Sequence, residues 1–230
     1  MAEVCFILPP ELVPDGAVVE RETPYGVVVE QAGVLLRAPG TDPRALIYAA
    51  KAAGVRHLLA GDVVQPVSPL LEPGDLVIPA DTVDQTRLRP FTFFAGKGYG
   101  FIKLDPPFCP VLAERLAEAA RALTPRAFRR ATYVGIDGPR EATEAEQRMY
   151  RQWGADVAGP GLLPEAYLAR ELELHYAAAV AVGPADVLAV LRRAAAGGAA
   201  GRAGACACGQ AMAGPKAAGL VGEDWRTWLS

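Results

Sequence analysis

The side chains that could act as nucleophiles or metal ligands are few in this sequence of 230 residues. Its histidines are His57 and His175, its serines are Ser68 and Ser230, and asparagine is absent. Ser68 lies between valine and proline, without the glycine pattern of a nucleophile elbow, so a Ser-His-Asp hydrolase is not indicated. Each histidine comes at the start of an expected buried strand, and we assign neither of them a role.

The four cysteines lack the paired CxxC spacing of zinc knuckles, and two histidines are too few for a histidine-rich centre. The sequence therefore predicts no metal site. Cys5 and Cys109 are expected to be buried small hydrophobic side chains. Cys206 and Cys208 are separated by one residue, and they either form a strained disulfide or remain free thiols.

The composition argues against nucleic acids and membranes as partners. The net charge is −3, and no run of lysine and arginine is dense enough to follow a phosphate backbone. Proline, glycine or a charge interrupts each apolar stretch before the ~18 residues that a membrane span needs. The first ten residues lack the features of a signal peptide, so we expect a cytoplasmic protein. The excess of arginine over lysine and the lack of asparagine suit a thermophile or a GC-rich genome.

Short apolar strands alternate with amphipathic helices, a pattern typical of a largely parallel sheet between helical layers. Segment 176–182 is almost all alanine and valine, as in a central strand covered on both faces. The expected strands are 4–8, 27–29, 34–37, 58–60, 76–78, 132–136, 156–158 and 176–182. The expected helices are 43–53, 109–122, 144–153, 164–173 and 184–196, several with proline near the first turn.

Two stretches are expected to be irregular. Residues 82–100 form a long exposed loop that borders a pocket, and their phenylalanines are core or subunit contacts. Residues 197–209 are rich in alanine and glycine, and they form a flexible link, with the CxC pair, to a short terminal helix. Hydrophobic residues make up 51% of the chain, enough for one core, and we expect a single domain over 1–230.

Three blocks of sequence, in register from about residue 45 to residue 186, point to one family. The first is LEPGDLVIP at 71–79, which continues to RPFTFF at 89–94, and the second is DPPFCP at 105–110. The third combines TYVGIDGPR at 132–140, RMYRQWGADV at 148–157 and LPEAYLARE at 163–171. Together they resemble the methylthioadenosine phosphorylase branch of the trimeric purine nucleoside phosphorylases, whose thermophilic members often carry a CxC near the carboxyl end.

The resemblance implies a three-layer α/β/α fold around a mixed, partly barrel-like sheet. It also implies a trimer, or a hexamer of two trimers, with a purine nucleoside site near the subunit contacts. The family reaction is phosphorolysis, in which phosphate attacks the ribose C1′ and the purine leaves. Phosphate is then the co-substrate, and the resemblance implies no other cofactor.

The sequence departs from the family where phosphate should bind. The glycine-rich turn after the first strand is replaced by Pro-Pro followed by Glu11, which carries the wrong charge. The Arg-His-Gly segment keeps Arg37 and loses its histidine. The Asn-Ala-Val-Gly-Ser segment falls on residues 62–66, which begin with Asp62 and Val63, and the threonine of the Met-Thr pair becomes Gly161.

The purine pocket is altered as well. Glu141 follows the Gly-Pro-Arg segment, and in the Thr-Asp-x-Asp segment Pro184 replaces the first acid and leaves Asp186. Asp186 is either the remaining catalytic acid or a helix cap. Arg37 binds an anion or is ion-paired, Asp62 binds a sugar hydroxyl or closes a turn, and Glu141 contacts a ligand or forms a salt bridge. The candidate substrate-binding residues are Arg37, Asp62, Val63, Glu141 and Gly161.

Three hypotheses for function follow from these substitutions. The leading one is a divergent phosphorylase that keeps a nucleoside pocket while phosphorolysis is altered or lost, since each missing charged donor costs roughly 1.5–3 kcal/mol. The second is a non-catalytic binding or structural protein, for which a catalytic paralogue is one conceivable partner. The third is a nucleosidase, in which water replaces phosphate and Glu141, Asp62 or Asp186 is the base. Convergence of these carboxylates in a hollow favours an enzyme or a binder, whereas filling by Pro160, Pro184 and aromatic side chains favours a structural role.

Overall fold

The strands pair into a single mixed sheet. The computed structural model describes residues 4–96, 102–197, 206–222 and 224–229. The strands are β1 Val4–Leu8, β2 Val18–Thr23, β3 Gly26–Gln31, β4 Val34–Leu36, β5 His57–Pro66, β6 Leu76–Asp84, β7 Ala127–Gly135, β8 Val157–Gly159 and β9 His175–Val182. The α-helices are α1 Pro43–Ala52, α2 Pro110–Arg121, α3 Glu144–Gln152, α4 Glu165–Glu171, α5 Val187–Ala196 and α6 Ala213–Ala217.

The strand order is β2-β3-β4-β1-β5-β8-β7-β6-β9, with a further pairing between β5 and β9. Strand β5 therefore pairs with three strands: β1 and β9 in parallel, and β8 in antiparallel orientation. The pairings β5–β8, β8–β7, β7–β6, β6–β9 and β9–β5 close a ring of strands. The sheet is thus mixed and partly barrel-like.

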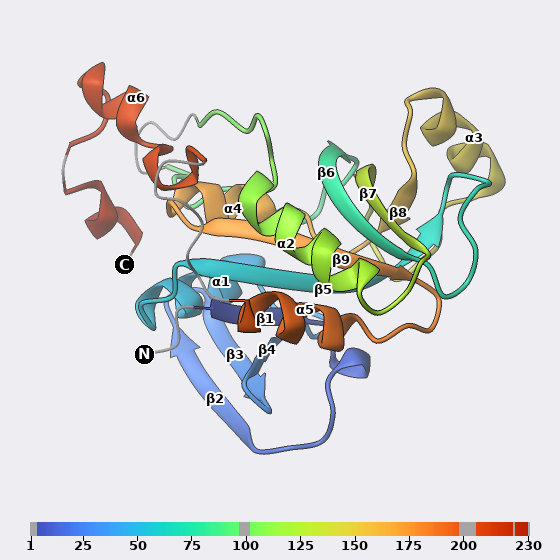
Figure 1. The fold of residues 1–230 in the computed structure, drawn as a ribbon. Helices are drawn as coiled ribbons and strands as arrows, with labels where there is room; N and C mark the ends of the chain where they lie inside the picture. The colour runs from blue at the N-terminus through green and yellow to red at the C-terminus, as the bar shows by residue number, and fades with distance from the viewer. Residues whose placement is uncertain (1–3, 97–101, 198–205, 223, 230) are drawn as a thin grey trace.

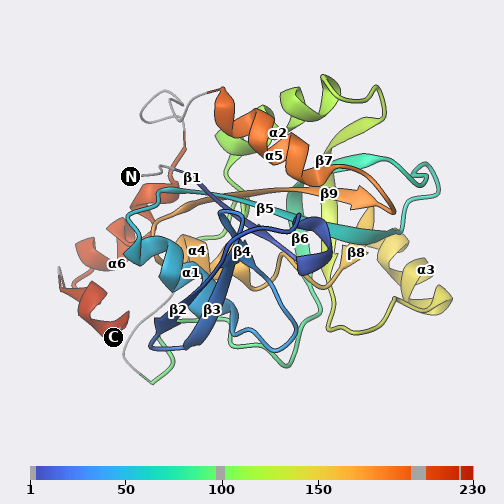
Figure 2. The ribbon, with the colours of Figure 1, turned by 90° about the horizontal axis from the view of Figure 1, so that it is seen from below.

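Alternating side chains assign the two faces of the sheet to two hydrophobic clusters. Along β9, Tyr176, Ala178 and Val180 pack in the cluster that includes α1 and α4, whereas Ala177 and Ala179 pack in the cluster that includes α2 and α5. The two helix pairs lie on opposite sides of the sheet (Figures 1 and 2). This is the three-layer α/β/α arrangement, with β9 buried on both faces as its composition predicts.

Most expected elements are present within a few residues, and one strand was not expected. Helices α1 and α2 begin with proline, and Asp42 caps α1 by accepting a 2.8 Å hydrogen bond from the Arg44 N–H. The unexpected strand is β2, which pairs with β3 in an antiparallel hairpin. Its sequence VVERET is mostly exposed, so it lacks the apolar alternation that reveals a half-buried strand.

The carboxyl-terminal segment packs back onto the α1–α4 face. Residues 198–205 of the expected link lie outside the described residues. After them, Met212 and Trp225 are fully buried in the same cluster as α1 and α4. The Tyr25 hydroxyl donates to the Leu229 carbonyl at 3.0 Å, which ties this segment to the loop between β2 and β3. No helix within the described ranges is long and apolar enough to cross a membrane.

Residues 97–100 of the expected exposed loop at 82–100 lie outside the described residues, and the rest of it is only partly exposed. Strand β6 extends into it as far as Asp84, and Phe93 and Phe94 are buried. The Glu171 carboxylate accepts hydrogen bonds from the Thr92 hydroxyl and the Phe93 N–H, both at 2.7 Å. Burial raises the pKa of Glu171 to about 7, although these two hydrogen bonds lower it. The loop is therefore anchored on a carboxyl group that titrates near neutrality.

We predict that Glu171 makes stability depend on pH. Its pKa rises from 4.5 to about 7 on folding, so its favourable contribution is complete below 4.5 and is lost as the pH rises through about 7. Glutamine has nearly the same shape and cannot titrate. The Tm of wild type minus that of Glu171→Gln should therefore fall between pH 5 and 8, roughly the span of this shift. The exposed Glu20→Gln is the control, and a constant difference for Glu171→Gln would contradict the prediction.

Candidate functional site

A network of buried polar side chains joins the end of β4 and strands β5, β7 and β9 to the loop after β8 and the start of α4. Arg37 directly follows β4, Asp62 lies in β5, and Glu165 is the first residue of α4. Asp62 and Glu165 are only 4% and 1% exposed, in the middle of an apolar core. Buried carboxylates of this kind need positive or N–H partners close by.

Arg37 is the cation of the network, and it is paired internally. Its Nε and Nη2 donate to the two carboxylate oxygens of Glu165 at 2.6 and 2.8 Å, and Nη1 donates to the Gly61 carbonyl at 2.8 Å. The Tyr176 hydroxyl adds a fourth bond, to Glu165 Oε2 at 2.8 Å. Burial lowers the pKa of Arg37, but the charge and hydrogen bonds of Glu165, together with the charge of Asp62, outweigh it and the net direction is upward. The guanidinium is thus permanently charged and held by bidentate bonds.

Asp62 fixes the loop after β8. Its Oδ2 accepts from the Gly161 N–H at 2.9 Å and its Oδ1 from the Val63 N–H at 3.0 Å. The Tyr133 hydroxyl accepts from the same Gly161 N–H at 3.0 Å. Burial raises the pKa of Asp62 to about 6, against the opposing effect of Arg37.

Gly161 is required by this arrangement. A Cβ atom at position 161 would overlap Asp62 Oδ2 and lie only 2.6 Å from Arg37 Nη1. No serine or threonine fits there while Asp62 and Arg37 keep their places. The Asp62 side chain has therefore taken the space that a hydroxyl residue at 161 would need.

A pocket of 500 Å³ lies beside this network. Its walls come from the ends of β5, β8 and β9 and from the segment between β7 and α3. Val63 lies next to Asp62 in sequence, and Gly159 and Pro160 directly precede Gly161, so the pocket and the network share two segments. The lining residues are Val63, Val64, Gln65, Pro66, Pro73, Ile136, Arg140, Glu141, Gln147, Ala158, Gly159, Pro160, Val182 and Gly183.

Two segments beside the pocket are held in place by hydrogen bonds, the one that follows β8 and the one that precedes α3. Arg89 Nη1 donates to the carbonyls of Pro160 and Leu163, the latter at 2.8 Å. Gln65 forms two bonds with Ala142, donating to its carbonyl at 3.2 Å and accepting from its N–H at 2.8 Å. The pocket is therefore largely preformed, with one polar edge at Arg140 and Glu141.

Comparison with known proteins identifies the family. A family model described as the phosphorylase superfamily matches residues 24–205. The chain belongs to the phosphorylase superfamily. It is 38% identical over 146 residues to an S-methyl-5′-thioadenosine phosphorylase of Thermofilum pendens, covering 64% of this chain and 56% of that protein. It is 43% identical over 138 residues to one from Gloeobacter violaceus, covering 58% and 46%. The chain thus spans about half the length of the curated relatives it matches.

Solved structures agree with the superfamily fold. A methylthioadenosine phosphorylase from an antarctic soil metagenomic library superposes with a TM-score of 0.71 at 29% identity, covering 85% of each chain. The methylthioadenosine phosphorylase of Schistosoma mansoni in complex with adenine gives 0.68 at 26% identity, covering 85% and 87%. The expected nucleoside-phosphorylase-type fold is confirmed.

The structure places the candidate residues of this superfamily member in three different settings. Arg37, Asp62 and Gly161 belong to the buried network, while Val63 and Glu141 line the pocket. Asp186 is exposed and caps α5, where its Oδ1 accepts from the Ala189 N–H at 2.8 Å, and it does not line the pocket. The three carboxylates Asp62, Glu141 and Asp186 therefore do not converge.

Three members of the network were not singled out in the sequence: Tyr133, Glu165 and Tyr176. Glu165 lies within one of the blocks that resemble the family. Its pairing with Arg37 spans 128 residues, so no local spacing in the sequence indicates it. The available signal was the position of a carboxylate at the head of an apolar helix, since such a group needs a cation when it is buried.

The expected disulfide candidates lie away from the pocket. Cys206 and Cys208 are both free thiols in the structure, and their sulfurs lie near Cys109 and His175. The predicted absence of a metal site rested on spacing within the sequence, which does not register ligands from distant segments.

We predict that the Arg37–Glu165 pair is stabilising only as a complete pair. Glu165→Gln leaves a buried guanidinium without its counter-charge and should destabilise the fold by about 3–5 kcal/mol. The double variant Arg37→Met/Glu165→Leu removes both charges and should be less destabilised than Glu165→Gln. Urea unfolding at pH 7 measures both.

The matched control is the exposed pair Arg21–Glu30, whose closest atoms are 2.7 Å apart. Glu30→Gln should cost at most about 1 kcal/mol, because solvent screens that pair. Equal losses for Glu30→Gln and Glu165→Gln, or a double variant less stable than Glu165→Gln, would contradict the assignment.

Proposed function

We propose that this chain binds a purine nucleoside of the methylthioadenosine type in the pocket beside β5 and β8, and that it has lost phosphorolysis. The observation that carries the proposal is the internal pairing of Arg37. The relatives named above are S-methyl-5′-thioadenosine phosphorylases, which supports the ligand class. Since the chain spans about half their length, ligand and activity alike are proposals here.

The phosphate-binding side of the site is filled by the protein itself. Every nitrogen of the Arg37 guanidinium donates to a protein oxygen, and two of the acceptors belong to Glu165. A phosphate dianion would have to displace that carboxylate and then lie near Asp62 as well. Desolvating the dianion is offset only by several convergent donors, which these residues do not offer.

The turn after β1 also argues against phosphate binding, through its backbone N–H groups. Residues Pro10–Leu12 form a 3-10 turn in which the Leu12 and Val13 N–H groups donate to the carbonyls of Pro9 and Pro10, both at 3.1 Å. Pro10 has no N–H to offer, and the Glu11 side chain is exposed at the turn. The turn therefore uses the Leu12 and Val13 amides internally and places a carboxylate where the family places a glycine-rich phosphate cradle.

The neighbouring pocket suits a nucleoside. Its 500 Å³ falls within the usual range of about 300–1,000 Å³ for small-molecule sites. Val63, Ile136 and Pro160 supply apolar walls for a planar base, and Glu141 supplies an acceptor for base N–H groups. A related structure in complex with adenine supports a purine as the base.

The geometry also bears on the two other hypotheses, a structural protein and a nucleosidase. Pro160 lines the pocket and does not fill it, which favours a ligand-binding protein over a purely structural one. Of the three carboxylates considered as the base of a nucleosidase, only Glu141 lines the pocket. Water-dependent cleavage would therefore have to use Glu141.

The test incubates the purified chain with methylthioadenosine or inosine, with and without millimolar phosphate, and follows base release by chromatography. We expect no phosphate-dependent release, while calorimetry detects binding of at least one nucleoside. Phosphate-dependent turnover near one per second, a rate typical of an ordinary enzyme, would contradict the loss of phosphorolysis. Release that does not require phosphate would establish the nucleosidase instead.

The control for the binding site compares two valine substitutions. Val63→Phe adds an aromatic ring inside the pocket and should abolish nucleoside binding. Val18→Phe makes the same change on the exposed strand β2 and should leave the binding unchanged. Equal binding by both variants would place the ligand elsewhere.

We further propose that the chain forms a trimer or a hexamer, as the resemblance implies. Support comes from the segment between β6 and α2, where Leu88 is 85% and Phe91 is 65% exposed. Large apolar side chains exposed within one short segment are typical of interaction surfaces. Light scattering should give the mass of three or six chains, and Phe91→Glu should reduce it. A stable monomer of the wild type at micromolar concentration would contradict the proposal.

A further inference from the structure

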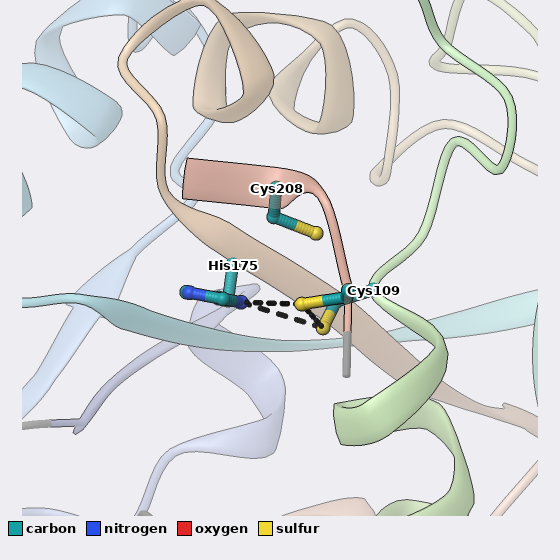
Figure 3. A group of neighbouring side chains, drawn as sticks. Cys109, His175 and Cys208 are labelled. Atoms are coloured by element: carbon teal, nitrogen blue, oxygen red, sulfur yellow. Dashed lines mark hydrogen bonds between the residues drawn. The ribbon is translucent and has the colours of Figure 1, made fainter. Parts of the chain in front are cut away.

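Four side chains with soft or borderline metal-ligating atoms meet on the side of the molecule away from the pocket. Cys109 is the residue before α2, His175 is the first residue of β9, and Cys206 and Cys208 come from the carboxyl-terminal segment. Three segments far apart in the sequence thus contribute to one cluster. Figure 3 shows the side chains of Cys109, His175 and Cys208 directed into a common space.

The distances within the cluster are short. The Cys109 and Cys206 sulfurs are 3.7 Å apart, and they lie 3.6 and 3.3 Å from the His175 Nδ1. The ligand atoms of all four residues, with Cys208 included, lie within 4.8 Å of one another.

These distances match the edges of a tetrahedron around zinc. With Zn–S bonds of about 2.3 Å and Zn–N bonds of about 2.0–2.1 Å, a tetrahedral site has S···S edges of about 3.8 Å and S···N edges of about 3.6 Å. We propose that Cys109, His175, Cys206 and Cys208 form a zinc site. Thiolates with one imidazole select zinc over magnesium or calcium, which prefer oxygen ligands.

Four protein ligands make this a closed, structural centre, with no position left for a substrate or a water. Cys109 and Cys208 are each 1% exposed, whereas His175 and Cys206 are partly exposed and give the ion a path from solvent. Cys109 also lies at the amino terminus of the 12-residue helix α2, whose positive dipole end favours a thiolate.

Two ligands are already held in place by backbone hydrogen bonds. The Cys109 N–H donates to the Tyr176 carbonyl at 2.7 Å, and the His175 N–H donates to the Arg56 carbonyl at 2.9 Å. The His175 ring also packs against His57, with ring centroids 4.9 Å apart. Strand β9 and the start of α2 therefore present half of the ligand set, and the carboxyl-terminal segment brings the other half to them.

The zinc ion fastens the carboxyl-terminal segment to the sheet. Two polar contacts link the described part of this segment to Glu173 after α4: the Met212 N–H donates to Glu173 Oε1 at 3.3 Å, and Arg226 pairs with Glu173 at 2.8 Å. Because a metal bound only by the folded state stabilises that state, the ion should hold down residues 206–229, whose Trp225 completes the core beside α1.

The first test measures metal in the full chain, purified with a reductant and without chelator. Elemental analysis should find one zinc per chain, and cobalt added to the metal-free wild type should give the intense visible bands of a tetrahedral thiolate site. Cys208→Ala and His175→Ala should lose both signals. Cys5→Ala is the matched control, since Cys5 lies in β1 outside the cluster, and it should keep them.

The second readout is stability. Chelator should lower the Tm of the wild type and of Cys5→Ala, and added zinc should restore it, with no such response from Cys208→Ala. Wild type that retains no zinc after incubation and desalting, or gives no tetrahedral cobalt spectrum, would overturn the proposal, as would a disulfide among these three cysteines in the freshly purified reduced protein. The wild-type measurements decide the matter even where a variant does not fold.

Discussion

The bidentate pair of Arg37 and Glu165 is the interaction on which the rest of the site depends. It joins the end of β4 to the start of α4, and through Gly61 and Tyr176 it also contacts β5 and β9. An external phosphate would compete for Arg37 with a carboxylate that is covalently part of the same molecule. The internal anion loses no translational freedom on binding, whereas phosphate does, so the internal pair has the advantage.

The substitutions around this pair are coupled. Asp62 beside Arg37 leaves no room for a Cβ atom at 161, so the aspartate and the glycine have to occur together. Asp62 in turn holds the Gly161 N–H, which sets the course of the segment that forms one wall of the pocket. On the function proposed above, the loss of phosphate ligands and the retention of the pocket then have one structural cause.

The sequence predicts the framework well, because apolar periodicity is a local signal. Strand β1 and the helices near 43–53 and 109–122 were predicted within about two residues, a usual uncertainty at element ends. The lengths of β5 and β6 were underestimated. Their carboxyl-terminal halves lie in the ring of strands, and apolar and polar residues alternate less clearly there. The exposed hairpin strand β2 carries no apolar pattern and was missed for that reason.

The site was less predictable, because its contacts join distant parts of the chain. Arg37 was singled out, but its partner Glu165 is fixed only by the packing of α4 against the sheet. For Asp186 the sequence left two alternatives, a catalytic acid or a helix cap, and in the structure it caps α5. The cluster of Cys109, His175, Cys206 and Cys208 shows the same limit, since only its last two members share a segment and the other two come from distant parts of the chain.

The most direct test is a crystal structure determined from crystals grown with both phosphate and methylthioadenosine. The account predicts electron density for the nucleoside in the pocket lined by Val63, Glu141 and Pro160, with Arg37 still bonded to Glu165 and no anion beside it. A phosphate ion bound to Arg37, with the Glu165 carboxylate moved away, would contradict the central claim.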